Sequence, residues 1–320
     1  MKRLAIVVVL FALSCAQKPE TPVTRAKVRL NINQTLTYGP IMIAKDEGFF
    51  DAEGIDAELV SLDSNSAVTA AVAGKLDVLS VGLRAGVFNM ILKGAPLQIV
   101  ADRGHSDPQR CSVDAFIAPI ALVKKIEAAD GDLRGQRIAM IRGGVMEFLT
   151  MRLLEQRGLT ANDIVMLQLP QGTPISSRDE LEAVRFTSEP ALSSALTEGW
   201  AGIIATADSV EPSHQNALLV YGKRLLHDDP ELGRRFMRAY LRGVRRFNKG
   251  KTESNVAILS RYTKLPPDVI RRACWIAIAN DGHIDPKTLQ PFLDWALAEN
   301  YLDAPAPVEK WWNPSFLESR

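Results

Sequence analysis

Two turns of this chain carry residues suited to binding an anion. Each follows a strand-like run and precedes a helix-like run, and they span Gln34–Gly39 and Arg142–Met146. A turn in this position offers unpaired backbone N–H groups and the positive end of a helix dipole, which together suit a carboxylate, sulfonate or phosphate. The dipole contributes only about 0.3–1 kcal/mol, so other donors must supply most of the affinity. The residues of these turns that we expect to contact a solute are Thr35, Thr37, Tyr38, Gly143, Gly144 and Val145.

Two arginines favour the same interpretation because they lie at strand–helix junctions. Arg84 follows the break at Gly82, and Arg142 opens the second turn. A guanidinium can bind an anion through two parallel hydrogen bonds, whereas an arginine at the start of a helix otherwise opposes the dipole. An anionic solute would therefore explain both positions, and Gly82 joins the expected site. The alternative is that each arginine points away from the turns and that the turns are merely solvated.

The sequence shows no pattern typical of a catalytic or metal site. The four histidines lack the spacing of metal ligands, and no GxSxG, P-loop or HExxH phrase occurs. His105 and Cys111 share one loop, but no third group that could activate the thiol is identifiable. We therefore expect no catalytic residue, no metal and no cofactor.

Two strand–turn–helix–strand units are needed to position the turns. In the first, the strand-like Val28–Asn33 is followed by the apolar Ile41–Phe50 and by the alternating Asp56–Leu62. A similar unit about a hundred residues later contains the strand Arg137–Ile141 and the helix Val145–Arg157. Ligands bind beyond the carboxyl ends of the strands in open α/β sheets, so both turns should face a cleft. The repetition predicts a duplicated lobe.

The C-terminal part is expected to be mostly helical. Asp229–Asn248 has an N-cap, a proline in its first turn and an apolar stripe opposed by arginines, which we interpret as a solvated face. Further helices are expected near Pro267–Ala279 and Pro286–Glu299. Cys274 falls in the first of them, where a buried free thiol is the commoner state. An oxidising compartment would permit a disulfide with Cys111, but we expect Cys274 to stay free.

The first fifteen residues have the features of an export signal. A basic pair, Lys2-Arg3, precedes ten apolar residues, Leu4–Leu13, and the small Ser14 lies at a cleavage position. That apolar run is too short to span a bilayer. The net charge of +1, with 47% hydrophobic and 23% charged residues, indicates a globular protein without a field that would recruit nucleic acid.

Residues 39–82 read GPIMIAKDEGFFDAEGIDAELVSLDSNSAVTAAVAGKLDVLSVG. This stretch resembles the solute-binding proteins of ABC importers for nitrate, sulfonates, taurine and thiamin-pyrimidine precursors. In that family the first helix ends in a Gly-Phe-Phe phrase followed by Gly-Ile or Gly-Leu, and a phrase with Ala, Gly and Asp follows it. The matching residues here are Gly48, Phe49, Phe50, Gly54, Ile55, Ala70 or Ala71, Gly74 and Asp77.

Two further sites follow from resemblance. Phe11–Cys15 resembles the bacterial lipobox, in which the thiol is diacylated and becomes the mature N-terminus, so Cys15 is the expected lipidation site. Two or three acyl chains anchor a protein stably. Glu189-Pro190 matches the family's Glu-Pro pair, whose glutamate often helps to bind the solute or to fix the cleft. The alternative is that Glu189 is a carboxylate at a helix N-terminus with no ligand role.

The resemblance implies an α/β, two-lobe fold of periplasmic-binding-protein type II, with two mixed, mainly parallel sheets and a ligand cleft between the lobes. The expected organisation is a signal peptide at 1–14, a lipidated Cys and tether at 15–26, the first part of lobe one at 27–117, lobe two at 118–221, and a return to lobe one with C-terminal helices at 222–320. It also implies a monomer in the periplasm or cell envelope, anchored by lipid. Such a protein closes around a small polar solute, anionic or heteroaromatic, and delivers it to an ABC permease with its ATPase.

Two alternatives stay open. One is an enzyme on the same fold, of the menaquinone-pathway or thiamin-pyrimidine type. The export signal argues against the first type, whose substrates are cytosolic, and the isolated cysteines argue against the second, whose relatives carry a cysteine cluster. The other alternative is a sensor lipoprotein that keeps the cleft but lacks a transporter.

Overall fold

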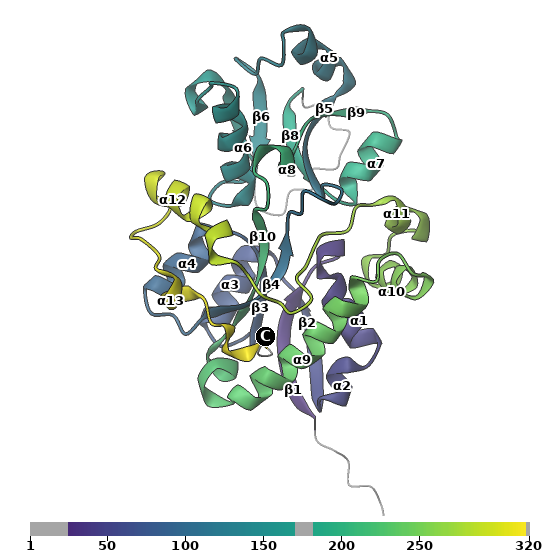
Figure 1. The fold of residues 1–320 in the computed structure, drawn as a ribbon, viewed down its shortest axis with the longest axis vertical. Helices are drawn as coiled ribbons and strands as arrows, with labels where there is room; N and C mark the ends of the chain where they lie inside the picture. The colour runs from purple at the N-terminus through teal and green to yellow at the C-terminus, as the bar shows by residue number, and fades with distance from the viewer. Residues whose placement is uncertain (1–24, 170–181, 318–320) are drawn as a thin grey trace, which may run out of the picture.

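A computed structural model describes residues 25–169 and 182–317, which form two α/β lobes (Figure 1). The expected signal peptide and Cys15 lie outside these residues. The first sheet has the order β2-β1-β3-β10-β4. Its strands are β1 (Ala26–Ile32), β2 (Ile55–Ser61), β3 (Val78–Gly82), β4 (Gln98–His105) and β10 (Gln215–Tyr221). β1 pairs in parallel with β2 and β3, and β10 pairs antiparallel with β3 and β4.

The second sheet repeats this plan with the order β7-β6-β8-β5-β9. Its strands are β5 (Asp114–Pro119), β6 (Arg137–Met140), β7 (Val165–Gln168), β8 (Val184–Ser188) and β9 (Ala201–Thr206). β6 pairs in parallel with β7 and β8, and β5 pairs antiparallel with β8 and β9. Each sheet thus contains one strand that opposes the direction of the others, which confirms the expected pair of mixed, mainly parallel sheets.

The chain crosses between the sheets twice, through residues 106–113 and 211–214. Both crossings come earlier than the expected boundaries at 117 and 221. The first sheet ends at His105 and the second begins at Asp114, while β10 belongs to the first sheet. All seven residues of β10 are buried, because this apolar strand is inserted between β3 and β4.

The helices before β10 follow the strands of their own lobe. In lobe one they are the 3₁₀ turn η1 (Leu36–Tyr38), α1 (Gly39–Asp46), α2 (Phe49–Ala52), α3 (Ser64–Val72) and α4 (Ala85–Leu92). In lobe two they are α5 (Ile120–Ala128), α6 (Val145–Gln156), the 3₁₀ turn η2 (Ala161–Asp163), α7 (Ala191–Thr197) and α8 (Ala207–Val210). The expected turns at 34–39 and 142–146 therefore lie where predicted, between β1 and α1 and between β6 and α6.

Helix α9 (Pro230–Phe247) follows β10 in lobe one, after the π-helical turn η3 (Arg224–Asp228). Its N-cap is Asp229, which accepts a hydrogen bond from the Leu232 N–H at 3.0 Å. The buried stripe packs on α1 so closely that a Cβ at Gly243 would lie 2.2 Å from the Pro40 carbonyl oxygen. The arginine face is more than solvated, because Arg238 pairs with Glu53 at 2.9 Å and other arginines of α9 also face α1 and α2.

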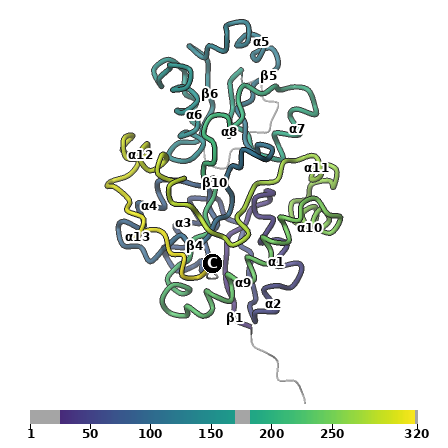
Figure 2. The backbone as a smooth tube through the Cα atoms, in the orientation of Figure 1, coloured from purple at the N-terminus to yellow at the C-terminus, as the bar shows by residue number. Residues whose placement is uncertain are grey.

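The segment after α9 differs most from expectation. It contains α10 (Glu253–Thr263), α11 (Pro267–Arg272), η4 (Pro286–Thr288), α12 (Gln290–Ala298), α13 (Val308–Trp311) and η5 (Pro314–Phe316). The helix expected over Pro267–Ala279 ends at Arg272, and the apolar run beyond it is extended, with Ala277 bridged to His105 of β4. Figure 2 shows this C-terminal part crossing lobe one before α12 reaches α6.

The expectation of a free Cys274 is wrong, because Cys274 and Cys111 form a disulfide. The physical reason is the extended backbone after Arg272, which carries Cys274 alongside the first crossing segment instead of burying it within a helix. The bond therefore ties the C-terminal part of lobe one to the first crossing segment, 106–113.

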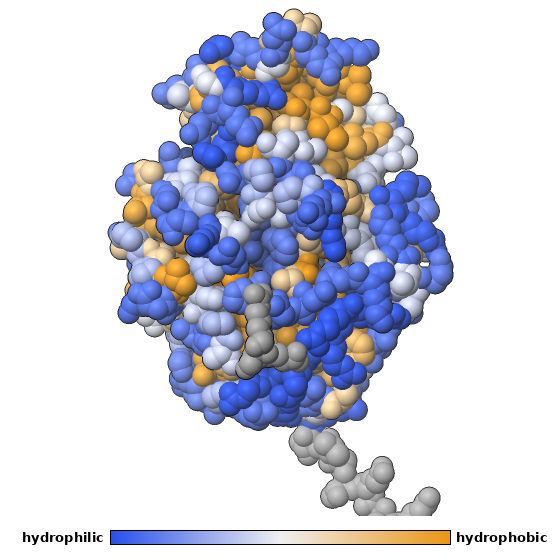
Figure 3. Space-filling model, viewed as in Figure 1, coloured by the Kyte–Doolittle hydropathy of each residue, from blue (hydrophilic) through white to orange (hydrophobic). Residues whose placement is uncertain are grey.

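The molecular surface is mixed. Figure 3 shows mostly polar residues over lobe one and a gathering of apolar residues on lobe two. The exposed apolar side chains of lobe two include Ile203 of β9, at 42%, and Ile120 of α5, at 38%. No helix among the described residues has the length and apolar character needed to cross a bilayer.

Candidate functional site

A small cleft of about 190 Å³ lies between the lobes, at the carboxyl ends of strands from both sheets. Four of the ten expected ligand-binding residues line it: Thr37, Gly82, Val145 and Glu189. Thr37 follows β1, Gly82 ends β3, and Val145 follows β6, so this is the position that the two βαβ units predict. The volume is below the roughly 300–1,000 Å³ of drug-sized pockets, which restricts the cleft to a small molecule.

Arg103 is the cationic group of this cleft. The residue is only 4% exposed, and its Nη1 donates to the carbonyl oxygen of Thr37 at 3.3 Å and to its Oγ1 at 3.2 Å. The guanidinium lies 4.5 Å from the ring centroid of Tyr38, a favourable cation–π position. The buried Nε has no hydrogen-bond partner, and no carboxylate of the described residues lies within ion-pair distance of Arg103. A buried, unpaired charge is costly, so this arrangement suits an anionic ligand.

Sequence reasoning missed Arg103 because residues 102–114 look like one polar loop. In the structure β4 continues through His105, and the polar residues at its end are held by distant partners. Asp102 accepts hydrogen bonds from the Gln215 side chain, the Ala279 N–H and the His105 ring. Gln215 and Ala279 are more than a hundred residues away in sequence, so local periodicity does not indicate that the strand continues here.

Asp114 and Asn216 line the cleft close to the two crossings, because Asp114 begins β5 and Asn216 lies near the start of β10. The Asn216 amide donates to Asp114 Oδ2 at 2.9 Å. Burial raises the pKa of the Asp114 carboxyl above its ordinary value, although hydrogen bonds from Ser188 and Asn216 and the charge of His214 oppose the shift. The acceptor oxygen of Asn216, Oδ1, is buried without a partner. Neither residue was among those expected from the sequence.

Glu189 joins lobe two to the C-terminal segment. Its Oε1 accepts from the Ser193 hydroxyl at 2.7 Å and from the Cys274 N–H at 2.9 Å. Its Oε2 accepts from the Ser193 N–H at 3.1 Å. The carboxylate therefore accepts three hydrogen bonds from within the protein. This position is suited to holding lobe two and the C-terminal segment together at the cleft.

The glycine turn at 143–145 meets lobe one directly. The Val145 N–H donates to the Leu83 carbonyl at 3.0 Å, and the Ala85 N–H donates to the Gly143 carbonyl at 3.1 Å. The Gly143 N–H donates to its own Glu147 at 2.7 Å. The amides of Gly143 and Val145 that we expected to hold an anion are therefore occupied by protein, because the lobes are in contact around Gly144.

The remaining expected residues lie outside the cleft. Arg84 and Arg142 face an outer hollow between α3, α4 and Tyr301. Arg84 donates to Asn65 at 2.7 Å, and burial lowers the pKa of its guanidinium, with Asp63 opposing. Arg142 donates to the Tyr301 hydroxyl at 2.8 Å and to Glu147 at 3.2 Å, and the charge of Glu147 is the main cause that raises its pKa.

Thr35 and Tyr38 support the cleft from behind. The Thr35 hydroxyl donates to Asn33 at 2.8 Å and lies 3.0 Å from the Thr37 hydroxyl. The Tyr38 hydroxyl donates to the Ser80 carbonyl at 3.1 Å, which holds the ring under Arg103. These two expected residues therefore position the side chains that line the cleft.

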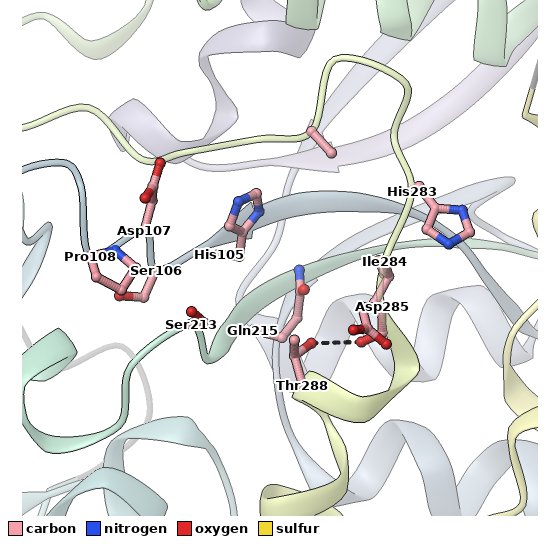
Figure 4. A pocket seen from close by; sticks show the side chains of 11 residues that line it. His105, Ser106, Asp107, Pro108, Ser213, Gln215, His283, Ile284, Asp285 and Thr288 are labelled. Atoms are coloured by element: carbon pink, nitrogen blue, oxygen red, sulfur yellow. Dashed lines mark hydrogen bonds between the residues drawn. The ribbon is translucent and has the colours of Figure 1, made fainter. Parts of the chain in front are cut away.

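A larger hollow, of about 480 Å³, lies on the hinge side of lobe one. Figure 4 shows its labelled side chains, with His105 and His283 on opposite sides of Gln215 and the Thr288 hydroxyl bonded to Asp285. Its lining comes from the ends of β4 and β10, the crossing segments and the C-terminal part, without a strand of the second sheet. The cleft is the better candidate because both lobes line it and because it contains buried polar atoms without partners. Among the described residues, no cluster of three His, Cys, Asp or Glu side chains could hold a metal ion.

Two α/β lobes joined by two crossings around a cleft define the periplasmic-binding-protein type II architecture. The family described as NMT1/THI5 like matches residues 36–249, more than half of the chain, and the protein belongs to this family. No curated protein sequence matches it.

Solved structures share the fold at low sequence identity. The periplasmic nitrate-binding protein NrtA from Synechocystis PCC 6803 is 16% identical, with a TM-score of 0.72 over 92% of this chain and 87% of that one. The alkanesulfonate-binding protein SsuA from Xanthomonas axonopodis pv. citri, bound to MOPS, is 18% identical, with a TM-score of 0.69 over 90% and 99%. The desulfurization enzyme DSZB is 13% identical, with a TM-score of 0.62 over 91% and 97%. At these identities the likeness defines the fold alone.

Proposed function

We propose that this protein is the extracytoplasmic solute-binding component of an ABC importer. The observation that carries the proposal is the cleft itself, which has walls from both lobes and a buried Arg103 with no carboxylate partner among the described residues. The solute is small, polar and anionic at one end. Its closest contacts are Thr37, Gly82, Arg103, Val145 and Glu189, and Arg84, Arg142, Gly143 and Gly144 stabilise the closed state from outside the cleft.

The mechanism is hinge closure. A ligand that touches both lobes favours the state in which they are in contact over the open state. The lobe contact at 83–85 and 143–145 consists of two backbone hydrogen bonds between turns, which can separate without unfolding either sheet. The two crossings, at 106–113 and 211–214, are the segments that would absorb the rotation.

Delivery and location complete the proposal. Cleavage before Cys15 and acylation of its thiol would anchor the mature chain to a membrane, with residues 16–26 as a tether. The anchored protein then presents its solute to a permease and ATPase. The fold is also used by an enzyme, but in this cleft the sulfur of Cys274 is bonded to Cys111 and offers no thiol nucleophile.

The test is a thermal-shift screen of the mature chain carrying Cys15→Ser, against anionic, zwitterionic, cationic and neutral small molecules. We expect at least one compound to raise the melting temperature and to bind with one-to-one stoichiometry in calorimetry, unchanged in structure after incubation. Release of a chemically altered product would instead establish an enzyme, and the absence of any stabilising compound would contradict the solute-binding role.

A further inference from the structure

Two buried polar atoms of the cleft lack partners, and they are of opposite kinds. The Nε of Arg103 is a donor, and the Oδ1 of Asn216 is an acceptor. Their residues are 4% and 7% exposed, so water has little access to either. Buried polar groups in folded proteins nearly always find a hydrogen-bond partner, and both of these residues line the cleft.

We propose that the cleft selects a small amphoteric solute, which carries an anionic group for Arg103 and an N–H donor for Asn216 and Asp114. The inference rests on the proposed solute-binding role and specifies the solute's chemistry. It assigns recognition to three residues of the hinge side, instead of the glycine turn at 143–145.

The anionic end is specified by what surrounds Arg103. Nη1 is held by two oxygens of Thr37, and the Tyr38 ring covers the guanidinium plane. These contacts fix the orientation of the group but leave its charge without a counter-ion among the described residues. A carboxylate or sulfonate bonded to Nε would supply both the missing hydrogen bond and the missing charge.

The donor end is specified by Asn216 and Asp114. Asn216 uses its amide nitrogen on Asp114 Oδ2 at 2.9 Å, which fixes the amide orientation and turns Oδ1 into a free acceptor. A carboxylate beside a carbonyl oxygen favours a donor as its neighbour, and an amine, amidine or amide N–H fits both oxygens. A solute without N–H groups would leave Oδ1 buried and unsatisfied.

The charged side chains that line the cleft form no ion pairs with one another. Arg103, Asp114 and Glu189 line the same cleft of about 190 Å³, yet no ion pair joins them within 4 Å. Glu189 is occupied by Ser193 and Cys274. The wall contributed by lobe two combines the apolar Val145, Met146 and Phe186 with the polar Asp114, Ser188 and Glu189. A short carbon skeleton with polar groups at both ends matches this distribution.

Calorimetry with matched compounds tests the proposal. The mature chain carrying Cys15→Ser is titrated with sets that share one skeleton: 2-aminoethanesulfonate, ethanesulfonate and ethylamine, then 4-aminobutanoate, butanoate and butylamine. We expect the amphoteric member of at least one set to bind at least tenfold more tightly than both of its partners. The proposal is overturned if, in every set that binds, the anion-only or the amine-only compound binds as tightly as the amphoteric one or more tightly.

If no compound of either set binds, the proposal is tested by the chemical groups of the compound that stabilises the protein most in the thermal-shift screen. A solute with both an anionic group and an N–H donor supports the inference. One that lacks either group overturns it while leaving the solute-binding role intact, and the absence of any binder contradicts the role itself.

Substitutions test which residues bind the anionic end and the donor end of the solute. Arg103→Met should weaken binding of the preferred compound at least tenfold, and Arg103→Lys, which keeps the charge, should lose less. Asn216→Leu, which removes the acceptor, should reduce the preference over the anion-only analogue. The control is Arg134→Met, since Arg134 is an exposed arginine of the α5–β6 loop paired with Asp132. Unchanged affinity in folded Arg103→Met, confirmed by circular dichroism, refutes the anionic end.

Discussion

The backbone N–H of Val145 in lobe two donates to the carbonyl oxygen of Leu83 in lobe one at 3.0 Å. The reciprocal bond, from Ala85 to Gly143, places the first turns of α4 and α6 against each other. The N-terminus of α6, which we expected to bind an anion, therefore binds the opposite lobe. The contact lies beside the cleft that Val145 lines, so under the proposed hinge closure it would form as the lobes come together.

Enlarging Gly144 should oppose closure. A Cβ at this position would lie 3.2 Å from the Leu83 carbonyl oxygen, closer than most such contacts, so the lobes must move apart to accept it. We expect Gly144→Ala to weaken solute binding by a few fold and Gly144→Val by roughly tenfold, about 1.4 kcal/mol. The melting temperature of the solute-free protein should change little.

Gly86→Ala is the matched control, because a Cβ there meets no atom within 4 Å. Calorimetric titration of all three variants with one compound makes the comparison. Wild-type affinity in Gly144→Val would show that the contact at 83–85 and 143–145 does not limit binding.

Removing the disulfide should destabilise the protein. Cys111 and Cys274 are separated by 163 positions, and such a cross-link restricts the unfolded chain strongly. We expect the double variant Cys111→Ala and Cys274→Ala to lose about 2–5 kcal/mol of unfolding free energy in urea titrations. Rapid alkylation of either cysteine in the folded wild type, without reductant, would be incompatible with the bond.

His105 should make stability depend on pH. Burial lowers the pKa of its imidazole, but the hydrogen bond and charge of Asp102, with the charge of Asp107, outweigh this and raise the pKa above its ordinary value, against a smaller opposing effect of Arg110. A folded-state pKa above the unfolded one stabilises the protein below the unfolded value, near 6.5, and the gain is lost as pH rises through the folded value.

Urea unfolding at pH 6 and pH 8.5 measures this effect against His105→Gln. The wild type should lose more unfolding free energy between the two pH values than the variant does. The difference should be small, because the His105 side chain is 32% exposed and solvent screens the pair. Identical pH dependence in the two proteins would mean that His105 is not coupled to folding.

Cys15 should determine membrane attachment. Fractionation of cells that express the full chain should place the wild type with membranes and Cys15→Ser in the soluble envelope fraction, because only the thiol can be acylated. The melting temperature should be the same for both. Membrane association that survives the substitution would refute the lipid anchor.

Much of the frame could be predicted because its signals are local. Apolar periodicity and the glycines after the helices indicate the βαβ units. Asp229 and Pro230 indicate the start of α9. The turn that contains Thr37 was placed correctly for the same reason. Glu189 was found through its Glu-Pro phrase, which is also local.

Arg103 and Asn216, which we propose bind the solute, escaped prediction because their partners are remote in sequence. Arg103 becomes a cleft residue only when β4 extends through His105, and that extension depends on Asp102 receiving donors from Gln215 and Ala279. Asn216 faces Asp114 across 102 positions of sequence. The disulfide was missed because an apolar run such as that around Cys274 fits a helix or an extended segment equally well.

Small-angle X-ray scattering tests hinge closure most directly. The mature chain carrying Cys15→Ser is measured alone and with a saturating amount of the compound that stabilises it most in the thermal-shift screen. We predict that the compound reduces the radius of gyration and brings the profile into agreement with a structure whose lobes touch at 83–85 and 143–145. A radius of gyration that stays the same with the compound bound would contradict capture of the solute by closure.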